Sequence, residues 1–184
     1  MAHYLFDRMS CLIVDDSNFM RSLIIGALGA LGVYQVKVAE HGGDAIDLLR
    51  LMKVDPLRAG IMSVDMIISN WQMSPVDGMM LLRWIRRGAD SPNRFIPFIM
   101  ITAYSETERV RESRDLGVTE FLTKPFSVNT LAQKIAQTIE RPRQFVHTQD
   151  YFGPDRRRNV KSFDHGERRL LKETSPGVEV VYDD

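Results

Sequence analysis

The chain has 184 residues with 24 basic and 24 acidic side chains, so its formal net charge is zero. A neutral protein has no overall field that attracts nucleic acid, and no apolar run approaches the roughly 20 residues of a membrane-spanning helix. We therefore expect neither nucleic-acid binding nor membrane insertion. Cys11 is the only cysteine, which excludes an intramolecular disulfide. Because the N-terminus also lacks the apolar run of a signal peptide, we expect a cytoplasmic protein.

Apolar runs alternate with segments of helical period along most of the chain. Ser17 is a suitable N-cap for the first helix and Gly32 a suitable end, whereas Asp55-Pro56 breaks the second helical segment. In chain order the pattern predicts a strand at 11–14, a helix at 17–31, a strand at 33–39, a helix at 43–52, a strand at 64–69, a helix at 78–87, a strand at 95–102, a helix at 105–116, a strand at 120–123 and a helix at 127–139.

Five strands alternating with five helices predict an α/β domain with a doubly wound, five-stranded parallel sheet. We place this domain at residues 8–139. Polar residues that follow different strands should then meet at the carboxyl edge of the sheet. The regular pattern stops after Arg141-Pro142. Residues 140–184 are therefore interpreted as a tail that is disordered without a ligand.

Four motifs occur in order on the predicted elements. They are LIVDDS (residues 12–17), IISNWQMSPVDG (residues 67–78), IMITAY (residues 99–104) and FLTKPF (residues 121–126). Together they resemble the CheY-like receiver domain of two-component signalling, which has a flavodoxin-like (βα)5 fold.

The resemblance implies a role for each polar residue at the sheet edge. In that family two acids hold Mg²⁺ beside a phosphorylated aspartate, a lysine pairs with the phosphoryl group, and a threonine and an aromatic residue switch together. By position these are Asp15, Asp16, Asn70, Lys124, Thr102 and Phe121. Asn70 stands where the family has its phosphorylated aspartate. An amide is not the required nucleophile, and losing a charge weakens Mg²⁺ binding.

Three explanations of Asn70 remain open. Asn70 is a natural feature of a receiver that is not phosphorylated, or an engineered substitution that keeps the protein unphosphorylated. Alternatively, Asp77 takes over as the acceptor. Asp15, Asp16 and Lys124 then either keep a weakened metal site or form only an ion-pair cluster that stabilises the loops.

The tail has a basic region, since residues 150–172 contain seven arginines and lysines but four acids. Arginine makes bidentate hydrogen bonds to the O6 and N7 atoms of guanine and to phosphate oxygens. A carboxylate accepts hydrogen bonds from guanine N–H groups, and aromatic rings stack on bases. Cyclic di-GMP has two guanines and two phosphates and would use each of these groups. The candidate ligand-binding residues are Tyr151, Gly153, Pro154, Asp155, Arg156, Arg157 and Arg158, followed by Phe163, Asp164, Arg168 and Arg169.

This tail resembles that of the Cle proteins, the CheY-like cyclic di-GMP effectors of alphaproteobacteria. The resemblance implies a non-enzymatic effector that binds cyclic di-GMP through the tail and engages the flagellar motor switch through residues 105–139. Gly153-Pro154 is interpreted as a fixed turn within the motif. The alternatives are a solvated tail, a nucleic-acid-binding tail, and a conventional response regulator whose phosphoacceptor is replaced by Asn70.

Overall fold

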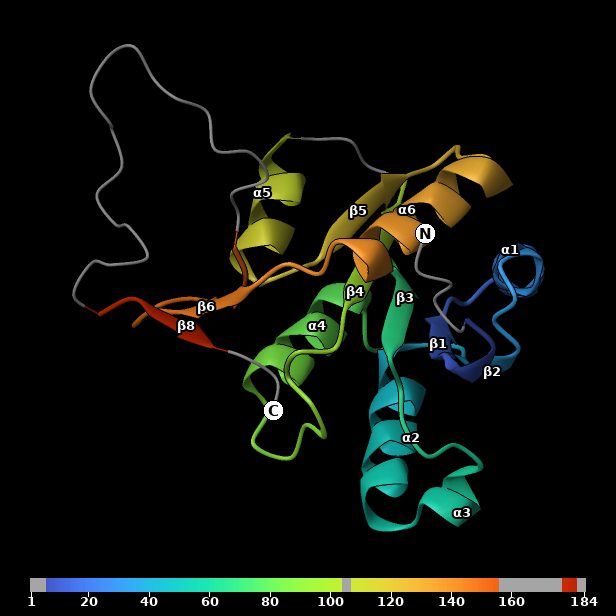
Figure 1. Ribbon diagram of the computed structural model, residues 1–184, viewed down its shortest axis with the longest axis horizontal. Helices are drawn as coiled ribbons and strands as arrows, with labels where there is room; N and C mark the ends of the chain where they lie inside the picture. Colours follow the sequence, from blue (N-terminus) through green and yellow to red (C-terminus); the bar gives the residue numbers. More distant parts are fainter. Residues whose placement is uncertain (1–5, 104–106, 156–176, 182–184) are drawn as a thin grey trace.

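A five-stranded parallel sheet forms the centre of the molecule. The computed structural model describes residues 6–103, 107–155 and 177–181. The sheet has the strand order β2-β1-β3-β4-β5, and all four pairings are parallel (Figure 1). Its strands are β1 (Ser10–Val14), β2 (Gln35–Ala39), β3 (Met66–Asn70), β4 (Phe98–Thr102) and β5 (Glu120–Thr123). The predicted doubly wound α/β fold is confirmed.

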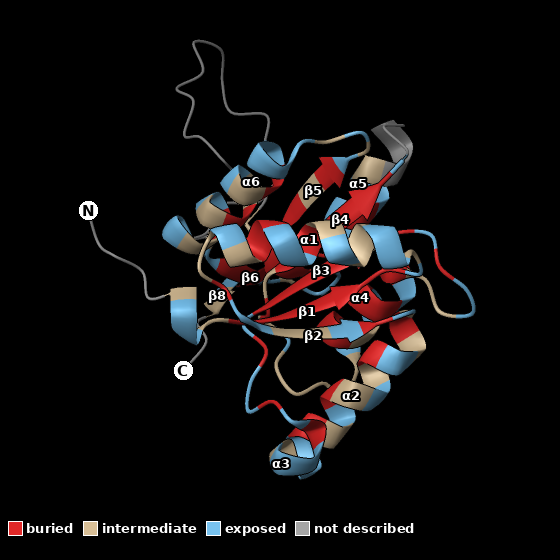
Figure 2. Cartoon of the chain, turned by 90° about the vertical axis from the view of Figure 1, so that its right-hand side faces the viewer, coloured by how far each residue is buried: buried red, intermediate tan, exposed pale blue. Residues whose placement is uncertain are grey.

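Helices cover both faces of this sheet. Successive side chains of a strand point to opposite faces. In β1, Leu12 belongs to the apolar cluster that includes α2 and α4, whereas Ile13 belongs to the cluster with α1 and α6. The inner strands β1, β3 and β4 are consequently buried on both sides, whereas the edge strand β2 is partly exposed (Figure 2). After a 3-10 turn at Phe6–Arg8, the helices are α1 (Asn18–Ala30), α2 (Gly42–Val54), α3 (Pro56–Ala59), α4 (Gly78–Arg87), α5 (Thr107–Asp115) and α6 (Val128–Glu140).

The predicted elements differ from the structure mainly at their ends. Three predicted strands begin two or three residues too early, because Val33, Val64 and Ile96 are buried apolar residues of loops. The short helix α3 was not predicted. The Asp55-Pro56 pair that breaks α2 also starts α3, since the Asp55 side chain accepts a hydrogen bond from the Arg58 N–H and proline suits the first helical position.

Three short strands follow α6 and form a second, antiparallel sheet with the order β7-β6-β8. They are β6 (Phe145–His147), β7 (Phe152–Pro154) and β8 (Glu179–Val181). The interpretation of the chain beyond residue 142 as irregular is thus corrected for residues 143–155 and 177–181. Strands of three residues are too short to show an alternating pattern. Gly153 and Pro154 accordingly lie in β7 and not in the predicted turn.

The second sheet is attached to the receiver through aromatic rings. Phe145 and Phe152 are only 9% and 6% exposed. Both contact Phe95 from the loop before β4, with ring centroids 5.1 and 5.3 Å from it, and the Arg94 guanidinium lies 3.5 Å above the Phe152 ring. Edge-on ring pairs and cation–π contacts add to the apolar burial. The tail is therefore anchored on the receiver up to Asp155.

Replacing this aromatic anchor should destabilise the protein. The change Phe152→Ala is expected to lower the free energy of unfolding by about 3 kcal/mol, because a buried phenyl ring is lost. Chemical denaturation measures this. The matched control is Phe19→Ala, which removes a ring that is 73% exposed. Equal small effects of the two changes would contradict the anchoring role.

Candidate functional site

The predicted polar residues lie at the carboxyl edge of the parallel sheet. Asp15 and Asp16 follow β1, Asn70 ends β3, Thr102 ends β4 and Lys124 follows β5. The sheet therefore brings together residues from four strands, as parallel topology requires. They surround a pocket of about 280 Å³ whose lining residues are Asp16, Asn70, Gln72, Thr102, Ala103 and Lys124.

Asn70 is held at the centre of this pocket by its own hydrogen bonds. Its Nδ2 donates to Asp16 Oδ1 at 3.2 Å and to the Gln72 carbonyl at 2.8 Å. Its Oδ1 accepts from Lys124 Nζ at 3.3 Å. The amide thus joins an acid on one side to a base on the other. A carboxylate in this position could not donate to Asp16.

Asp15 is the buried acid of the site, with a side chain only 1% exposed. Its Oδ1 accepts from the Ser17 N–H at 2.8 Å, and its Oδ2 lies 3.7 Å from Lys124 Nζ. Burial raises the pKa of the Asp15 carboxyl, and the Asp16 carboxylate adds to this, whereas the Ser17 N–H and the Lys124 ammonium oppose it. The buried charge is therefore only partly compensated.

The residues present are a poor fit for Mg²⁺. This ion takes oxygen ligands in a near-octahedral arrangement. Asn70 turns its amide NH₂ towards Asp16 and its oxygen towards Lys124, so it offers no oxygen on the side of the aspartates. Within residues 6–103, 107–155 and 177–181, no cluster of three His, Cys, Asp or Glu side chains could hold a metal.

Of the two predicted switch residues, Thr102 lines the pocket at the sheet edge, whereas Phe121 does not. Thr102 is buried. Phe121 is half-buried and contacts Trp71 edge-on, with ring centroids 6.2 Å apart. Trp71 directly follows Asn70 and was not singled out from the sequence. The aromatic contact links the loop after β3 to β5.

The loop between β3 and α4 explains two further features of the sequence. The Asp77 side chain accepts from the Met80 N–H at 2.7 Å and caps α4, so it is occupied in a structural role and is not placed as an alternative phosphoacceptor. A Cβ atom at Gly78 would lie 2.2 Å from the Asn70 carbonyl oxygen. Glycine is therefore required where the helix approaches the end of β3. The Ser74-Pro75 peptide bond in this loop is cis.

The first part of the tail motif has structural contacts of its own. The Tyr151 hydroxyl donates to the Pro154 carbonyl at 2.7 Å, and Pro154 is buried. A Cβ at Gly153 would lie 2.6 Å from Gly117 Cα, so this glycine lets β7 approach the receiver. Asp155 is half-buried at the end of β7. The other candidate ligand residues, Arg156, Arg157, Arg158, Phe163, Asp164, Arg168 and Arg169, lie outside the described residues.

A second pocket lies beside the end of the docked strand β7. Its volume is about 390 Å³. Arg143, one of its lining residues, donates to the carbonyls of Thr119, at 3.1 Å, and of Asp155, and so joins the tail to the residue before β5. The lining combines three arginines with two acids and a tyrosine, and its residues are Arg111, Arg114, Asp115, Val118, Thr119, Glu120, Phe121, Arg143, Tyr151 and Pro154. The sequence alone does not single out these arginines. Arg111 and Arg114 lie on α5, and Arg143, from the segment after α6, joins them only in the folded protein.

Comparison with known proteins agrees with this architecture. Residues 11–136 match the family model of the response regulator receiver domain. The chain belongs to the response regulator receiver family. Chemotaxis protein CheY-3 of Vibrio cholerae is 33% identical to this receiver over 133 residues, which are 72% of this chain and 93% of that protein. Chemotaxis protein CheY of Pseudomonas aeruginosa is 32% identical over 133 residues, or 72% of this chain and 98% of that protein.

Solved receiver structures have the same fold. Vibrio cholerae CheY4 matches with a TM-score of 0.57 and 28% identity, covering 70% of this chain and 97% of its own. The receiver domain of the Arabidopsis thaliana histidine kinase CKI1, in complex with Mg²⁺ and BeF3⁻, matches with a TM-score of 0.61 and 28% identity, covering 72% and 91%. The family match ends before β6, so the second sheet lies beyond it. In the described part of this receiver, no helix has the length and apolarity needed to cross a membrane.

The change Asn70→Asp is expected to give the receiver a phosphoacceptor. The new carboxylate would stand beside Asp16, Thr102 and Lys124, so acetyl phosphate should label the variant in the presence of Mg²⁺ but not the unchanged protein. Intact-mass spectrometry detects the label. Asn70→Ala is the control, because it removes the amide without adding a carboxylate. An unlabelled aspartate variant would show that the remaining residues do not form a competent site.

The raised pKa of Asp15 predicts a specific pH dependence of stability. The folded state holds the Asp15 proton more tightly than the unfolded state, so this residue destabilises the fold progressively as pH rises through the range between its two pKa values. As pH rises above the ordinary aspartate pKa of about 4, the unchanged protein should therefore lose stability relative to Asp15→Asn, so the difference between their free energies of unfolding should grow. Urea titrations without divalent ions measure the difference. A difference that shrinks with rising pH would contradict the assignment.

Proposed function

We propose that this receiver is a non-enzymatic signalling effector that binds cyclic di-GMP through its arginine-rich tail. The position where strand β7 ends is the main support for this proposal. Strand β7 ends at Pro154, which lines the same pocket as Arg111, Arg114 and Arg143. After Asp155, the next residues of the sequence are Arg156-Arg157-Arg158. The chain therefore leaves the folded receiver, just before the arginine run, at a point beside receiver arginines.

The chemistry of this region matches both parts of a cyclic dinucleotide. Guanidinium groups bind phosphate oxygens and the O6 and N7 atoms of guanine, and the half-buried Tyr151 ring lines the same pocket and offers a face for stacking. The Asp155 carboxylate can accept from guanine N–H groups. Because Tyr151 and Asp155 flank the docked strand β7 and are held in place before ligand arrives, binding has no ordering cost at these two residues.

Asn70 supports a signal input other than phosphorylation. The amide is neutral, is not a phosphoryl acceptor, and is engaged with Asp16 and Lys124. The output surface in this proposal is α5, β5 and α6, of which α5 and β5 contribute residues to the arginine-lined pocket. The relatives named above are chemotaxis proteins, and we propose the flagellar motor switch as the partner, with motility and surface attachment as the responses.

The competing function is a conventional response regulator that carries an Asp-to-Asn substitution. The observation in its favour is that Asp15, Asp16, Thr102 and Lys124 are all present at the sheet edge. In that case the tail would be a solvated appendage of the anchored sheet, and the dinucleotide would not bind.

Calorimetric titration with cyclic di-GMP tests the proposal. The full chain should bind it, and a chain that ends at Asp155 should not, although the aromatic anchor is kept. Replacing Arg156, Arg157 and Arg158 by glutamine should weaken binding by roughly 100-fold or more, since charge-assisted hydrogen bonds are lost.

The matched control is glutamine replacement of three exposed arginines away from the tail, Arg8, Arg58 and Arg83. It removes the same charge and should leave the affinity within about twofold. The proposal fails if the full chain produces no heat, or if both triple variants bind equally well.

The partner proposal has a separate test. Cyclic di-GMP should change the affinity of the full chain for a purified flagellar motor switch protein by roughly tenfold, which is an ordinary coupling between two sites. Surface plasmon resonance with and without the dinucleotide measures this. An affinity that is unaffected by the dinucleotide would contradict the coupling.

A further inference from the structure

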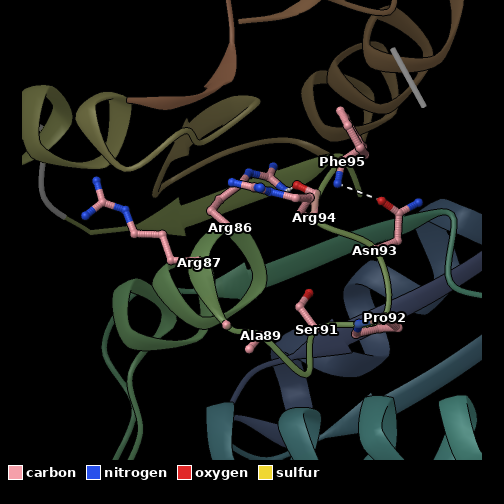
Figure 3. A pocket seen from close by; sticks show the side chains of 9 residues that line it. Arg86, Arg87, Ala89, Ser91, Pro92, Asn93, Arg94 and Phe95 are labelled. Carbon is pink, nitrogen blue, oxygen red and sulfur yellow. Dashed lines mark hydrogen bonds between the residues drawn. The ribbon is translucent and has the colours of Figure 1, made fainter. Parts of the chain in front are cut away.

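A third pocket of about 500 Å³ lies at the end of α4, in the loop that leads to β4. It is on the receiver itself and is separate from both pockets described above. Three arginines and no acid line it. The lining residues are Arg86, Arg87, Gly88, Ala89, Ser91, Pro92, Asn93, Arg94 and Phe95 (Figure 3).

The one acid within this loop is turned to other partners. Asp90 accepts from Arg50 Nε at 2.6 Å and from Trp84 Nε1 at 2.9 Å. Both partners lie outside the lining of the pocket. The positive charge of the three arginines is therefore not neutralised from this loop.

Arg86 is the unusual residue of the pocket, because its charged side chain is almost completely buried, with 1% exposure. Its Nε donates to the Gly117 carbonyl at 3.0 Å and its Nη1 to the Arg94 carbonyl at 2.7 Å. Its Nη2 has no acceptor in the part of the chain that the structure describes, and no carboxylate there pairs with the guanidinium. Burial lowers the pKa of Arg86 to about 9, which still leaves it charged at neutral pH.

Ser91 provides a second buried polar atom without a partner. Among the described residues nothing accepts from or donates to its Oγ. Buried polar atoms in folded proteins are nearly always hydrogen-bonded, so two exceptions in residues that line one pocket make it a candidate ligand site. Water would satisfy the hydrogen bonds but not the charge. An oxyanion does both, since it accepts from the guanidinium and the hydroxyl and offsets the positive charge.

We propose that this pocket binds a phosphate group. Arg86 Nη2 and Ser91 Oγ are the buried donors. Neither atom is accessible in this structure, so the loop of residues 88–95 has to shift to admit the phosphate, and the exposed side chains of Arg87 and Arg94 supply charge at the rim. The phosphate comes either from a free phosphate compound or from cyclic di-GMP, and in the second case the inference rests on the proposed function. Arg86 and Arg94 also lie against the rings of Phe145 and Phe152. Bound phosphate therefore stabilises the docked β6 and β7.

Phosphate titration of the full chain, followed by two-dimensional ¹H–¹⁵N NMR, tests the site. Inorganic phosphate is added against chloride at constant ionic strength. The amides of Gly88, Ala89 and Ser91 and the Arg86 Nε–H should shift and saturate. Ser91→Ala and Arg94→Gln should each weaken binding by roughly tenfold, while Arg58→Gln, which removes an exposed arginine of α3, should not.

Hydrogen exchange gives an independent readout of the same site. At a phosphate concentration that just saturates the unchanged protein, exchange of its β6 and β7 amides should slow, and the same concentration should slow it much less in Ser91→Ala. The absence of saturable shifts at the pocket would overturn the proposal, and so would equal weakening by Arg58→Gln and Arg94→Gln, which would indicate general charge screening.

Cyclic di-GMP added to the variant without Arg156, Arg157 and Arg158 distinguishes the two sources of phosphate. Shifts of the Ser91 amide in that variant would assign the pocket to the dinucleotide. Shifts with inorganic phosphate alone would assign it to a free phosphate compound. The second result supports the pocket even if the full chain shows no affinity for cyclic di-GMP, so the failure of the proposed function can be told apart from the failure of this inference.

Discussion

The neutral amide of Asn70 is the constraint on which the function that we propose for this receiver depends. It donates to Asp16 and accepts from Lys124, so it joins the acidic and basic sides of the sheet edge without adding a charge. Asp15 remains buried with a raised pKa, since the Lys124 ammonium, 3.7 Å away, only partly compensates it. An edge of this kind cannot take a phosphoryl group on residue 70. We therefore place the input of the signal in the tail.

The docking of the tail depends on a small cluster of arginines and phenylalanines. Arg86 and Arg94 lie against the rings of Phe145 and Phe152, and Gly117 and Gly153 allow the two backbones to approach. Such contacts combine apolar burial with cation–π attraction. They tie the beginning of the tail to the receiver surface next to α5 and β5, so a ligand held by the tail acts on the surface that we propose for the partner.

The sequence was sufficient to predict the sheet and the residues at its edge, because alternating elements and polar residues after strands have a direct structural meaning. Ser17 and Ser127 cap α1 and α6 through local hydrogen bonds. The second sheet was not predictable, since its strands have three residues each and pair over long distances. The burial of Arg86 was not predictable either. Arginine is usually exposed, and this side chain is buried where it packs against the Phe145 ring.

We propose that cyclic di-GMP acts through the tail and not through the Asn70 pocket. Hydrogen–deuterium exchange of the full chain with and without the dinucleotide distinguishes the two. We expect slower exchange in residues 151–169 and in α5 and β5, with exchange in the loops around Asn70 unchanged. Protection confined to the Asn70 loops, or no protection at all, would contradict it.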